Sequence, residues 1–285
     1  MNDRAIHRSK KHPEQIRTKK SLGQNFILDD DLLTDLVSHA QITKNDSVLE
    51  IGTGLGTLTD ILSETAGEVV TIEVDDSLIP ALQVRFAFND RVRLIHADVL
   101  KTDLDGIIDS FSGIPKVVAN IPYYITTDII RKLFTLKRLK SVSLLVQKEV
   151  AEKMLARPGD KDHALISLLT HYYSEPVFCL DVPRERFHPS PNVDSAFIRL
   201  DMDPARRFHA NADLERLFLS VCDTLFFMRR KTLLNNLSAR FHFDRLTADD
   251  ILKASGIDPT RRGETLRLEE IYRLTEVLFE YLKKH

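Results

Sequence analysis

Short runs rich in β-branched residues alternate with helical patterns along the first half of the chain. This alternation constrains the fold more than any other feature of the sequence. The strand-like runs lie at 47–51, 69–73, 92–96, 116–120 and 141–147. The helical patterns lie near 30–40, 57–65, 77–88, 127–136 and 148–156. Strands that alternate with helices favour a parallel sheet with helices on both faces. We therefore predict a doubly wound, Rossmann-like α/β fold.

Two further strand-like runs, 177–182 and 195–200, follow with no helix of ordinary length between them. Their connection, "PRERFHPSPNVD", is interrupted by prolines, which favours a loop over a helix. We expect the two runs to form an antiparallel pair at the edge of the sheet. The predicted sheet then has seven strands.

From about residue 204 the pattern is helical only, with segments such as "ADLERLFLSVCDTLFF" and "RLEEIYRLTEVLFEYLKK". A chain of 285 residues is long enough for one large domain and a smaller one, each with its own core. We predict three parts: a basic N-terminal tail at 1–20, an α/β domain at 21–203 and a small all-helical C-terminal domain at 204–285.

Basic residues gather in two places, although the formal net charge is only −2. Residues 1–20 contain seven Lys or Arg side chains against two acidic ones, and Arg229, Arg230 and Lys231 form a second cluster. Such clusters suit a polyanion such as nucleic acid. Taken alone, they are better explained as a solvated tail and a solvated helix face. The nucleic-acid interpretation therefore depends on the other motifs.

The composition, with 43% hydrophobic and 29% charged residues, is that of an ordinary soluble protein. No run approaches the ~20 apolar residues that span a bilayer, and the stretch 1–15 lacks the apolar core of a signal peptide. Cys179 and Cys222 lie far apart and outside any metal-ligand spacing, which predicts two reduced packing residues and no metal. We expect a cytoplasmic protein that contacts no membrane.

A glycine-rich loop, "EIGTGLG" at 50–56, follows the first predicted strand and opens a helix. Glycines let the backbone approach a ligand closely, and a helix N-terminus offers N–H groups without partners. The spacing is G-x-G-x-G and not the G-x-G-x-x-G of dinucleotide folds. The loop indicates a nucleotide-like ligand near Gly52, with a plain tight turn as the alternative.

Two carboxylates follow the next strands in the right order. Glu73 ends the second strand, where an acidic residue in such folds binds a ribose diol. Asp98 follows the third strand, where it can accept a hydrogen bond from an adenine amino group. Each alone would be an ordinary solvated loop residue. Because the carboxyl ends of parallel strands meet at one edge of the sheet, Gly52, Glu73 and Asp98 together fit an adenosyl cofactor.

The fourth strand brings "NIPYY", at 120–124, to the same edge. The side-chain oxygen of Asn120 and the carbonyl of Ile121 can both accept hydrogen bonds, and Pro122 stiffens the turn that aims them. Two acceptors on an adenine amine would direct its lone pair at an electrophile such as a sulfonium methyl group. Tyr123 offers a face on which the base can stack. The alternative is a strand-ending Asn followed by a proline turn with packed tyrosines.

Several motifs are specific to one family and extend over nearly the whole chain. They are "SLGQNFILD" at 21–29, "EIGTGLGTLT" at 50–59, "IEVD" at 72–75, "ADVL" at 97–100, "NIPYYITT" at 120–127, "LLVQKEVAEKM" at 144–154, "RFHPSPNVDSAFIRL" at 186–200 and "RRKTLLNNL" at 229–237. The sequence resembles the ribosomal RNA adenine dimethyltransferase family of class I, S-adenosylmethionine-dependent enzymes. It is most similar to the small-subunit (16S-type) branch. The resemblance implies N6,N6-dimethylation of 16S rRNA adenosines during ribosome biogenesis, by a monomer that acts on a small-subunit assembly intermediate.

The resemblance also implies roles for particular residues. The implied cofactor site comprises Asn25, Ile27, Gly52, Glu73, Asp98 and Asn120. The implied catalytic residues face the target adenine and are Asn120, Tyr123 and Phe187. Phe187 would be a second aromatic clamp on a base taken out of its stack, with core packing between the last two strands as the alternative. By the same resemblance, 21–203 is a methyltransferase domain, and 204–285 binds RNA by shape and phosphate contacts.

Three departures from the family pattern touch RNA contacts and loop geometry more than chemistry. Met228 stands where Gln is more usual, 162–169 (beginning Asp162-His163-Ala164) replaces a segment that usually contains Tyr-Gly, and Thr53 replaces a frequent Pro.

Two other functions remain open. The erythromycin-resistance branch of the family methylates 23S rRNA and has motifs similar to "NIPYYITTDIIRK", but "FFMRRKTLLNNL" with "GIDPTRRGETLRLEEI" favours the small-subunit branch. The other is an RNA-binding factor for ribosome assembly or transcription whose methyltransferase activity is secondary. The intact Asn120, Glu73 and Asp98 argue against a lost active site.

Overall fold

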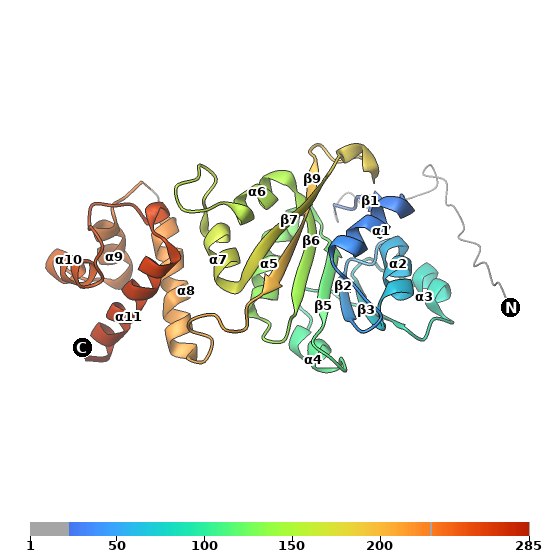
Figure 1. Ribbon diagram of the computed structural model, residues 1–285, viewed down its shortest axis with the longest axis horizontal. Coiled ribbons are helices and arrows are strands. Elements are labelled where there is room, and N and C mark those ends of the chain that lie inside the picture. The colour runs from blue at the N-terminus through green and yellow to red at the C-terminus, as the bar shows by residue number, and fades with distance from the viewer. Residues whose placement is uncertain (1–22, 229, 285) are drawn as a thin grey trace.

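The structure is a computed structural model that describes residues 23–228 and 230–284 (Figure 1). The basic tail predicted at 1–20 and Arg229 lie outside the described residues. The molecule is elongated: a helix-covered sheet occupies one part, and the C-terminal helices gather at the other end (Figure 1).

In the described residues, seven strands form one mixed sheet in the order β4-β3-β2-β5-β6-β9-β7. The first five are parallel, and β9 runs antiparallel to both of its neighbours. The strands are β2 (Ser47–Ile51), β3 (Glu68–Glu73), β4 (Val92–His96), β5 (Lys116–Asn120), β6 (Ser141–Gln147), β7 (Ser174–Val182) and β9 (Ser195–Met202). The predicted seven-stranded α/β fold, with an antiparallel pair at one edge, is confirmed.

Helices cover both faces of this sheet because successive strand residues point to opposite sides. In β2, Val48 belongs to the core under α1 (Asp30–His39) and α2 (Thr57–Thr65), whereas Leu49 belongs to the core on the other face. The second core is covered by α4 (Leu104–Asp109), α5 (Thr126–Thr135), α6 (Lys148–Leu155) and α7 (Leu165–Tyr173), and α3 (Ile79–Phe86) follows β3. Local signals start these helices: Asp29 caps α1 by accepting from Leu32 N at 3.0 Å.

Several elements differ from the prediction. The helix α4 is only six residues long, and α7, "LISLLTHYY", is apolar over most of its length, so neither shows a clear helical period. Strand β7 begins at 174 and not at 177, because it pairs with β9 from Ser174 onward. A further antiparallel pair joins β1 (Phe26–Ile27) to β8 (Phe187–His188). Strands of two residues leave no alternation in a sequence, so this pair was not predicted.

The described part of the C-terminal region contains α8 (Ala212–Phe227), α9 (Leu233–Phe241), α10 (Arg245–Ala254) and α11 (Leu268–Lys284). Asn211 caps α8 and Asp244 caps α10 through their side-chain oxygens. A single 3₁₀ turn at Gly263–Thr265 packs so closely on α8 that a Cβ at Gly263 would collide with the Leu225 carbonyl. The helical character predicted for this region is confirmed.

An aromatic cluster connects the sheet to the C-terminal helices. The ring of Tyr172 on α7 lies 4.3 Å from that of Phe218 on α8, which in turn lies 5.5 Å from Tyr272 on α11. Beside it, Arg206 and Glu215 form a largely buried ion pair with an N–O distance of 2.9 Å. One hydrophobic core continues through these rings. The boundary at 203–204 falls in the connection between β9 and α8, and the division into two domains stays a prediction.

Candidate active site

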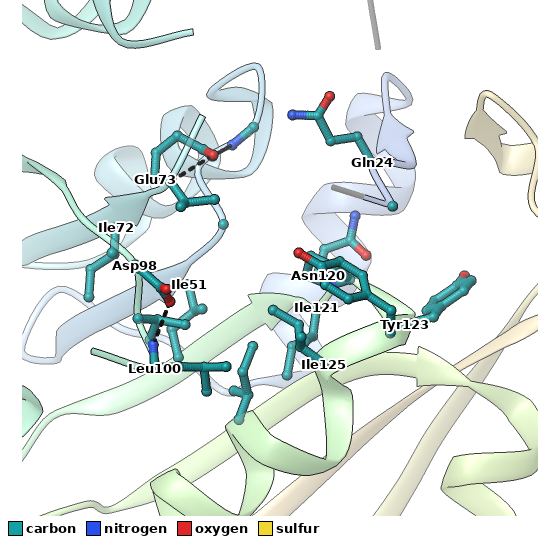
Figure 2. A pocket seen from close by; sticks show the side chains of 18 of the residues that line it. Gln24, Ile51, Ile72, Glu73, Asp98, Leu100, Asn120, Ile121, Tyr123 and Ile125 are labelled. Carbon is teal, nitrogen blue, oxygen red and sulfur yellow. Dashed lines mark hydrogen bonds between the residues drawn. The ribbon is translucent and has the colours of Figure 1, made fainter. Parts of the chain in front are cut away.

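A cavity of about 320 Å³ opens at the carboxyl ends of β2, β3 and β5. The chain leaves β2 toward β3 and then returns to β5 on the other side of β2, so this is the point where the strand order reverses. Open α/β sheets bind their ligands at such a point. Figure 2 shows Glu73 and Asp98 on one side of the cavity and Asn120 and Tyr123 on the other, with Gln24 above them.

The glycine loop between β2 and α2 borders this cavity. Gly52, Gly54 and Gly56 have φ angles of 83°, 55° and 81°, which residues with a side chain rarely adopt. The ring of Phe26 covers Gly54, where an added Cβ would lie 3.1 Å from it. The Gly54 N–H donates to Glu73 Oε2 at 2.8 Å, so the loop and the end of β3 hold one another.

The carboxylate of Glu73 is fixed by the backbone around it. It is 5% exposed and accepts three N–H groups, from Gly54 at 2.8 Å, Val74 at 2.9 Å and Asp75 at 2.8 Å. Burial raises the pKa of Glu73, while these N–H donors act in the opposite direction. A carboxylate has about four lone-pair sites. One site therefore remains for a ligand hydroxyl.

The side chain of Asp98 lies at the same edge, after β4. Its Oδ1 accepts from Leu100 N at 2.9 Å (Figure 2), and its Oδ2 lies 3.3 Å from Lys101 Nζ. Ile51, Ile72 and Leu100 add apolar surface to the cavity. This combination of a carboxylate and flat apolar walls suits an adenine ring with an exocyclic amine.

Asn120 ends β5 and has its amide oriented by a backbone group. Its Nδ2 donates to the Asn25 carbonyl at 2.9 Å, which leaves Oδ1 to accept from a ligand. Tyr123, in the 3₁₀ turn Tyr123–Ile125, is anchored by a hydrogen bond of 2.6 Å between its hydroxyl and Ser195 Oγ. Burial raises the pKa of Tyr123. Its ring lines the cavity, as does that of the exposed Tyr124, to which sequence reasoning gave no role.

The segment 23–26 lines the cavity from above, and the contacts that hold it and the adjoining Ile27 were missed from the sequence. Gln24 Nε2 donates to Asp75 Oδ2 at 2.7 Å, and Thr57 Oγ1 donates to the Ile27 carbonyl at 2.9 Å. Gln24 and Asp75 both lie in motifs typical of the family, "SLGQNFILD" and "IEVD". Their meeting depends on the path of the chain over the glycine loop, which no local pattern encodes.

The predicted site residues divide into two groups. Those that line the sheet-edge cavity are Asn25, Gly52, Glu73, Asp98, Asn120 and Tyr123. Ile27 and Phe187 lie outside it, 3% and 4% exposed, as Cα partners in the β1–β8 pair. Phe187 thus packs in the core under α1 and α2, close to the packing alternative considered for it. Its role as a clamp on the target base stays a prediction.

The departures from the family pattern also lie outside this cavity. Thr53 is buried, and its hydroxyl lies 2.6 Å from that of Thr71. His163 is buried against the C-terminal region, with Nδ1 3.0 Å from the Glu264 carbonyl and its ring edge-on to Phe226. The substitutions therefore affect the loop beneath the cavity and the contact with the C-terminal helices.

Other kinds of site find no support in the part of the chain that the structure describes. Residues 23–228 and 230–284 contain no group of His, Cys, Asp and Glu side chains arranged to hold a metal ion. Cys179 and Cys222 are both free thiols. None of the helices in those ranges combines the length and apolar character needed to cross a membrane.

The sheet topology and the position of the cavity define a class I methyltransferase. The model of the ribosomal RNA adenine dimethylase family matches residues 15–279, and the chain belongs to that family. It is 41% identical over 269 residues to the ribosomal RNA small subunit methyltransferase A of Clostridium botulinum (strain Loch Maree), covering 94% of this chain and 96% of the relative.

Solved structures agree with this family. The crystal structure of a dimethyladenosine transferase from Plasmodium falciparum superposes with a TM-score of 0.75 at 27% identity, over 90% of this chain and 97% of the other. The 23S rRNA methyltransferase ErmE gives a TM-score of 0.67 at 24% identity, over 90% of this chain and 100% of the other. At that identity, the second likeness shows the fold alone. Family and fold together imply the use of S-adenosylmethionine.

Proposed function

We propose that this protein transfers methyl groups from S-adenosylmethionine to the N6 amine of adenosines in small-subunit (16S-type) rRNA, twice per adenosine, during ribosome biogenesis. The observation that carries the proposal is the orientation of Asn120. Its amide nitrogen donates to the Asn25 carbonyl, which leaves its oxygen to accept, and the residue lines the cavity across from Glu73 and Asp98. The small-subunit name of the Clostridium relative supports the choice of RNA.

The residues of the cavity fit the cofactor. Glu73 has one lone-pair site left for the ribose hydroxyls, Asp98 would accept from the adenine amine, and Gly52 brings backbone without a side chain to the same cavity. Asn25 would add contacts from the segment above, and Ile27 would support that segment from the β1–β8 pair. The bound cofactor would supply an activated sulfonium methyl group.

The remaining groups would handle the target base. An adenine amine is a poor nucleophile because its lone pair is delocalised into the ring. Acceptance of its hydrogens by Asn120 Oδ1 and the Ile121 carbonyl would favour a pyramidal nitrogen whose lone pair points at the methyl group. Tyr123 would stack on the extruded base. Its hydroxyl contact with Ser195 would hold the ring in place.

The C-terminal helices would bind the rRNA outside the active site. Arg230 and Lys231 are exposed in the turn between α8 and α9, where they can neutralise phosphates. We assign the RNA-binding role to 204–285 and expect a cytoplasmic monomer that acts on a small-subunit assembly intermediate. The 23S-directed alternative has weaker support, because the likeness to ErmE concerns only the fold.

The test uses purified small and large ribosomal subunits that lack the modification, incubated with labelled S-adenosylmethionine. We expect label in the small subunit, recovered after nuclease digestion as N6,N6-dimethyladenosine, and a much weaker signal with Asn120→Ala. Label confined to the large subunit would transfer the assignment to the 23S-directed alternative. Tight binding of cofactor and subunit without methyl transfer would instead support the accessory factor.

A further inference from the structure

A second cavity, of about 210 Å³, lies in the C-terminal region between the end of α8 and the helix α9. It shares no described lining residue with the cavity at the sheet edge. Figure 1 shows α9 at the opposite end of the molecule from α2 and α3. A cavity of ~150 Å³ is enough to hold benzene. This one therefore has room for a heterocyclic ring.

Asn236, on α9, is the unusual residue of this cavity. Its side chain is fully buried, and neither Oδ1 nor Nδ2 has a hydrogen-bond partner among the described residues. Buried polar groups are nearly always paired, because an unpaired one loses its water without compensation. The neighbouring core positions of α9 are Leu233 and Leu237, so an apolar residue would suit the packing at 236. A ligand in the cavity could complete the hydrogen bonds of this amide.

The rest of the lining indicates which chemistry that ligand has. Phe227 is 83% exposed at the end of α8, and Arg240 is exposed on α9, with Nη2 3.4 Å from Ser220 Oγ; both residues line the cavity. Aromatic rings and guanidinium planes are the surfaces on which unpaired nucleobases stack. Thr224, Met228 and Ala239 also line the cavity.

The charges around the cavity suit a nucleic acid. Lys231 N donates to the Met228 carbonyl at 2.8 Å, which holds the exposed Arg230 and Lys231 beside the opening, where phosphates would pass. Among the described lining residues, Asp223 is the one with a carboxylate, and it lies 3.5 Å from Arg131 Nη2, so its charge is partly neutralised.

We propose that this cavity binds one unpaired nucleobase of the rRNA, at a nucleotide other than the methylated adenosine. Every base presents hydrogen-bond donors and acceptors side by side on an edge, and an Asn amide can pair with such an edge through two bonds at once. Asn236, which has no exposed surface in this structure, would form these bonds once the side chains that cover it move, while Phe227 stacks on the base. The inference rests on the proposed function in one respect, that the ligand is the RNA substrate.

The decisive variant is Asn236→Leu, with Ser238→Ala as its matched control. Ser238 lies on the same helix, and its buried hydroxyl is also unpaired among the described residues, but it does not line the cavity. We expect Asn236→Leu to keep or raise the melting temperature and to weaken binding of unmethylated small subunits by about 10- to 100-fold. Methyl transfer at saturating subunit should keep its rate. Ser238→Ala should change neither quantity.

Two outcomes would overturn the proposal. One is a lower melting temperature of Asn236→Leu with unchanged subunit affinity, because the amide would then be satisfied within the protein or by water. The other is an equal loss of affinity in Ser238→Ala, because the effect would then come from helix packing.

A second variant tests the cavity without touching the core. Phe227→Ala removes an exposed side chain, so the fold should survive while subunit affinity falls by about 10-fold, as expected for loss of a stacking face. A photo-crosslinking residue at position 227 should label a single unpaired nucleotide. Labelling confined to paired segments would contradict the proposal. Because crosslinking needs no methyl transfer, it reports on the cavity separately from the proposed reaction.

Discussion

The two cavities differ in how the Asn amide that lines each of them is hydrogen-bonded. At the sheet edge, the amide nitrogen of Asn120 donates to a backbone carbonyl, which orients the group and leaves its oxygen to accept. In the C-terminal region, Asn236 is buried with neither atom paired among the described residues. A group that must act on a reacting atom gains from being fixed before the substrate arrives. A group that only binds a ligand does not need to be oriented in advance, because the ligand itself supplies its hydrogen-bond partners. The first arrangement suits catalysis and the second suits recognition.

The parts of the protein that shape the two cavities also differ. The sheet-edge cavity is shaped by backbone: three glycines with positive φ and the N–H groups that hold Glu73. The C-terminal cavity is shaped by side chains of two helices, with exposed cations beside it. Changes in the first region should therefore alter the rate, and changes in the second should alter the binding of RNA.

The largest expected effect concerns Asn120. Asn120→Ala should lower single-turnover methyl transfer by about 10²-fold at saturating cofactor and RNA, comparable to the loss of one preorganised hydrogen bond at a reacting centre. The affinity for the small subunit should remain nearly unchanged. Rapid-quench measurement of product, with cofactor affinity determined calorimetrically in the same variant, checks this.

Tyr123 provides the matched pair for that experiment. Tyr123→Phe removes the hydrogen bond to Ser195 but keeps the stacking face, so it should retain most activity. Tyr123→Ala loses the face, worth about 1–3 kcal/mol per base, and should weaken capture of the extruded adenine. A wild-type rate for saturated Asn120→Ala would show that "NIPYY" is a structural turn, and the contrast between the two regions would disappear.

Much of the sheet-edge region could be predicted because its signals are local. Alternating strands and helices fix a parallel sheet, and its carboxyl edge gathers whatever residues end the strands, which is why Gly52, Glu73, Asp98 and Asn120 border one cavity. The partners of these groups were not predicted. That Asn120 donates to Asn25 depends on a segment 95 residues away in the chain, which no periodicity encodes.

The C-terminal region could be predicted only as far as its helices. Amphipathic spacing marks α8 and α11, but it does not show that Asn236 would be buried without a partner, since an Asn at that spacing is equally compatible with a solvated face. The β1–β8 pair was not predicted, for a related reason. Its two-residue strands are held by long-range contacts, such as the ion pair of Arg186 with Asp29, with an N–O distance of 2.5 Å.

The next prediction concerns the protonation of the Glu50 carboxyl, which lies beneath the sheet-edge cavity. Glu50, fully buried in β2, accepts from Thr59 Oγ1 at 2.6 Å, and burial raises the pKa of Glu50 from 4.5 to about 8 against the effect of this bond. The folded protein therefore keeps a proton that the unfolded chain releases. Between these pKa values the free energy of unfolding should fall as pH rises, by up to about 1.4 kcal/mol per pH unit.

Glu50→Gln isolates this contribution, since it imitates the neutral carboxyl and cannot titrate. Urea unfolding at pH 5.5, 6.5 and 7.5 should show a steeper loss of stability in the wild type than in the variant. The difference should level off below about 4.5 and above about 8, where both states have the same charge. Parallel curves would mean that Glu50 is ionised in the folded protein.

A smaller effect separates the two carboxylates of the cofactor site. Asp98→Ala should weaken S-adenosylmethionine binding by about 1–2 kcal/mol, the cost of one stranded amine, with little effect on folding. Glu73→Gln should weaken it and also lower the melting temperature, because its new amide would face one of the N–H donors that Glu73 now accepts. Calorimetry and thermal unfolding distinguish the two. Unchanged cofactor affinity in both variants would contradict the cofactor site.

The smallest effect concerns the charges that border the second cavity. Replacing Arg230 and Lys231 together with Ala should leave cofactor affinity and the saturated rate unchanged, and should reduce the log–log salt dependence of RNA binding. Two lost phosphate contacts correspond to about 1.4 to 1.8 units of slope. The control replaces Arg245 and Lys253, exposed cations on α10, which changes the net charge equally in the same region. If the slope falls equally in both double variants, the effect comes from the overall positive charge of the region and not from a defined phosphate contact. If it falls in neither, Arg230 and Lys231 are only solvated residues at the ends of the helices.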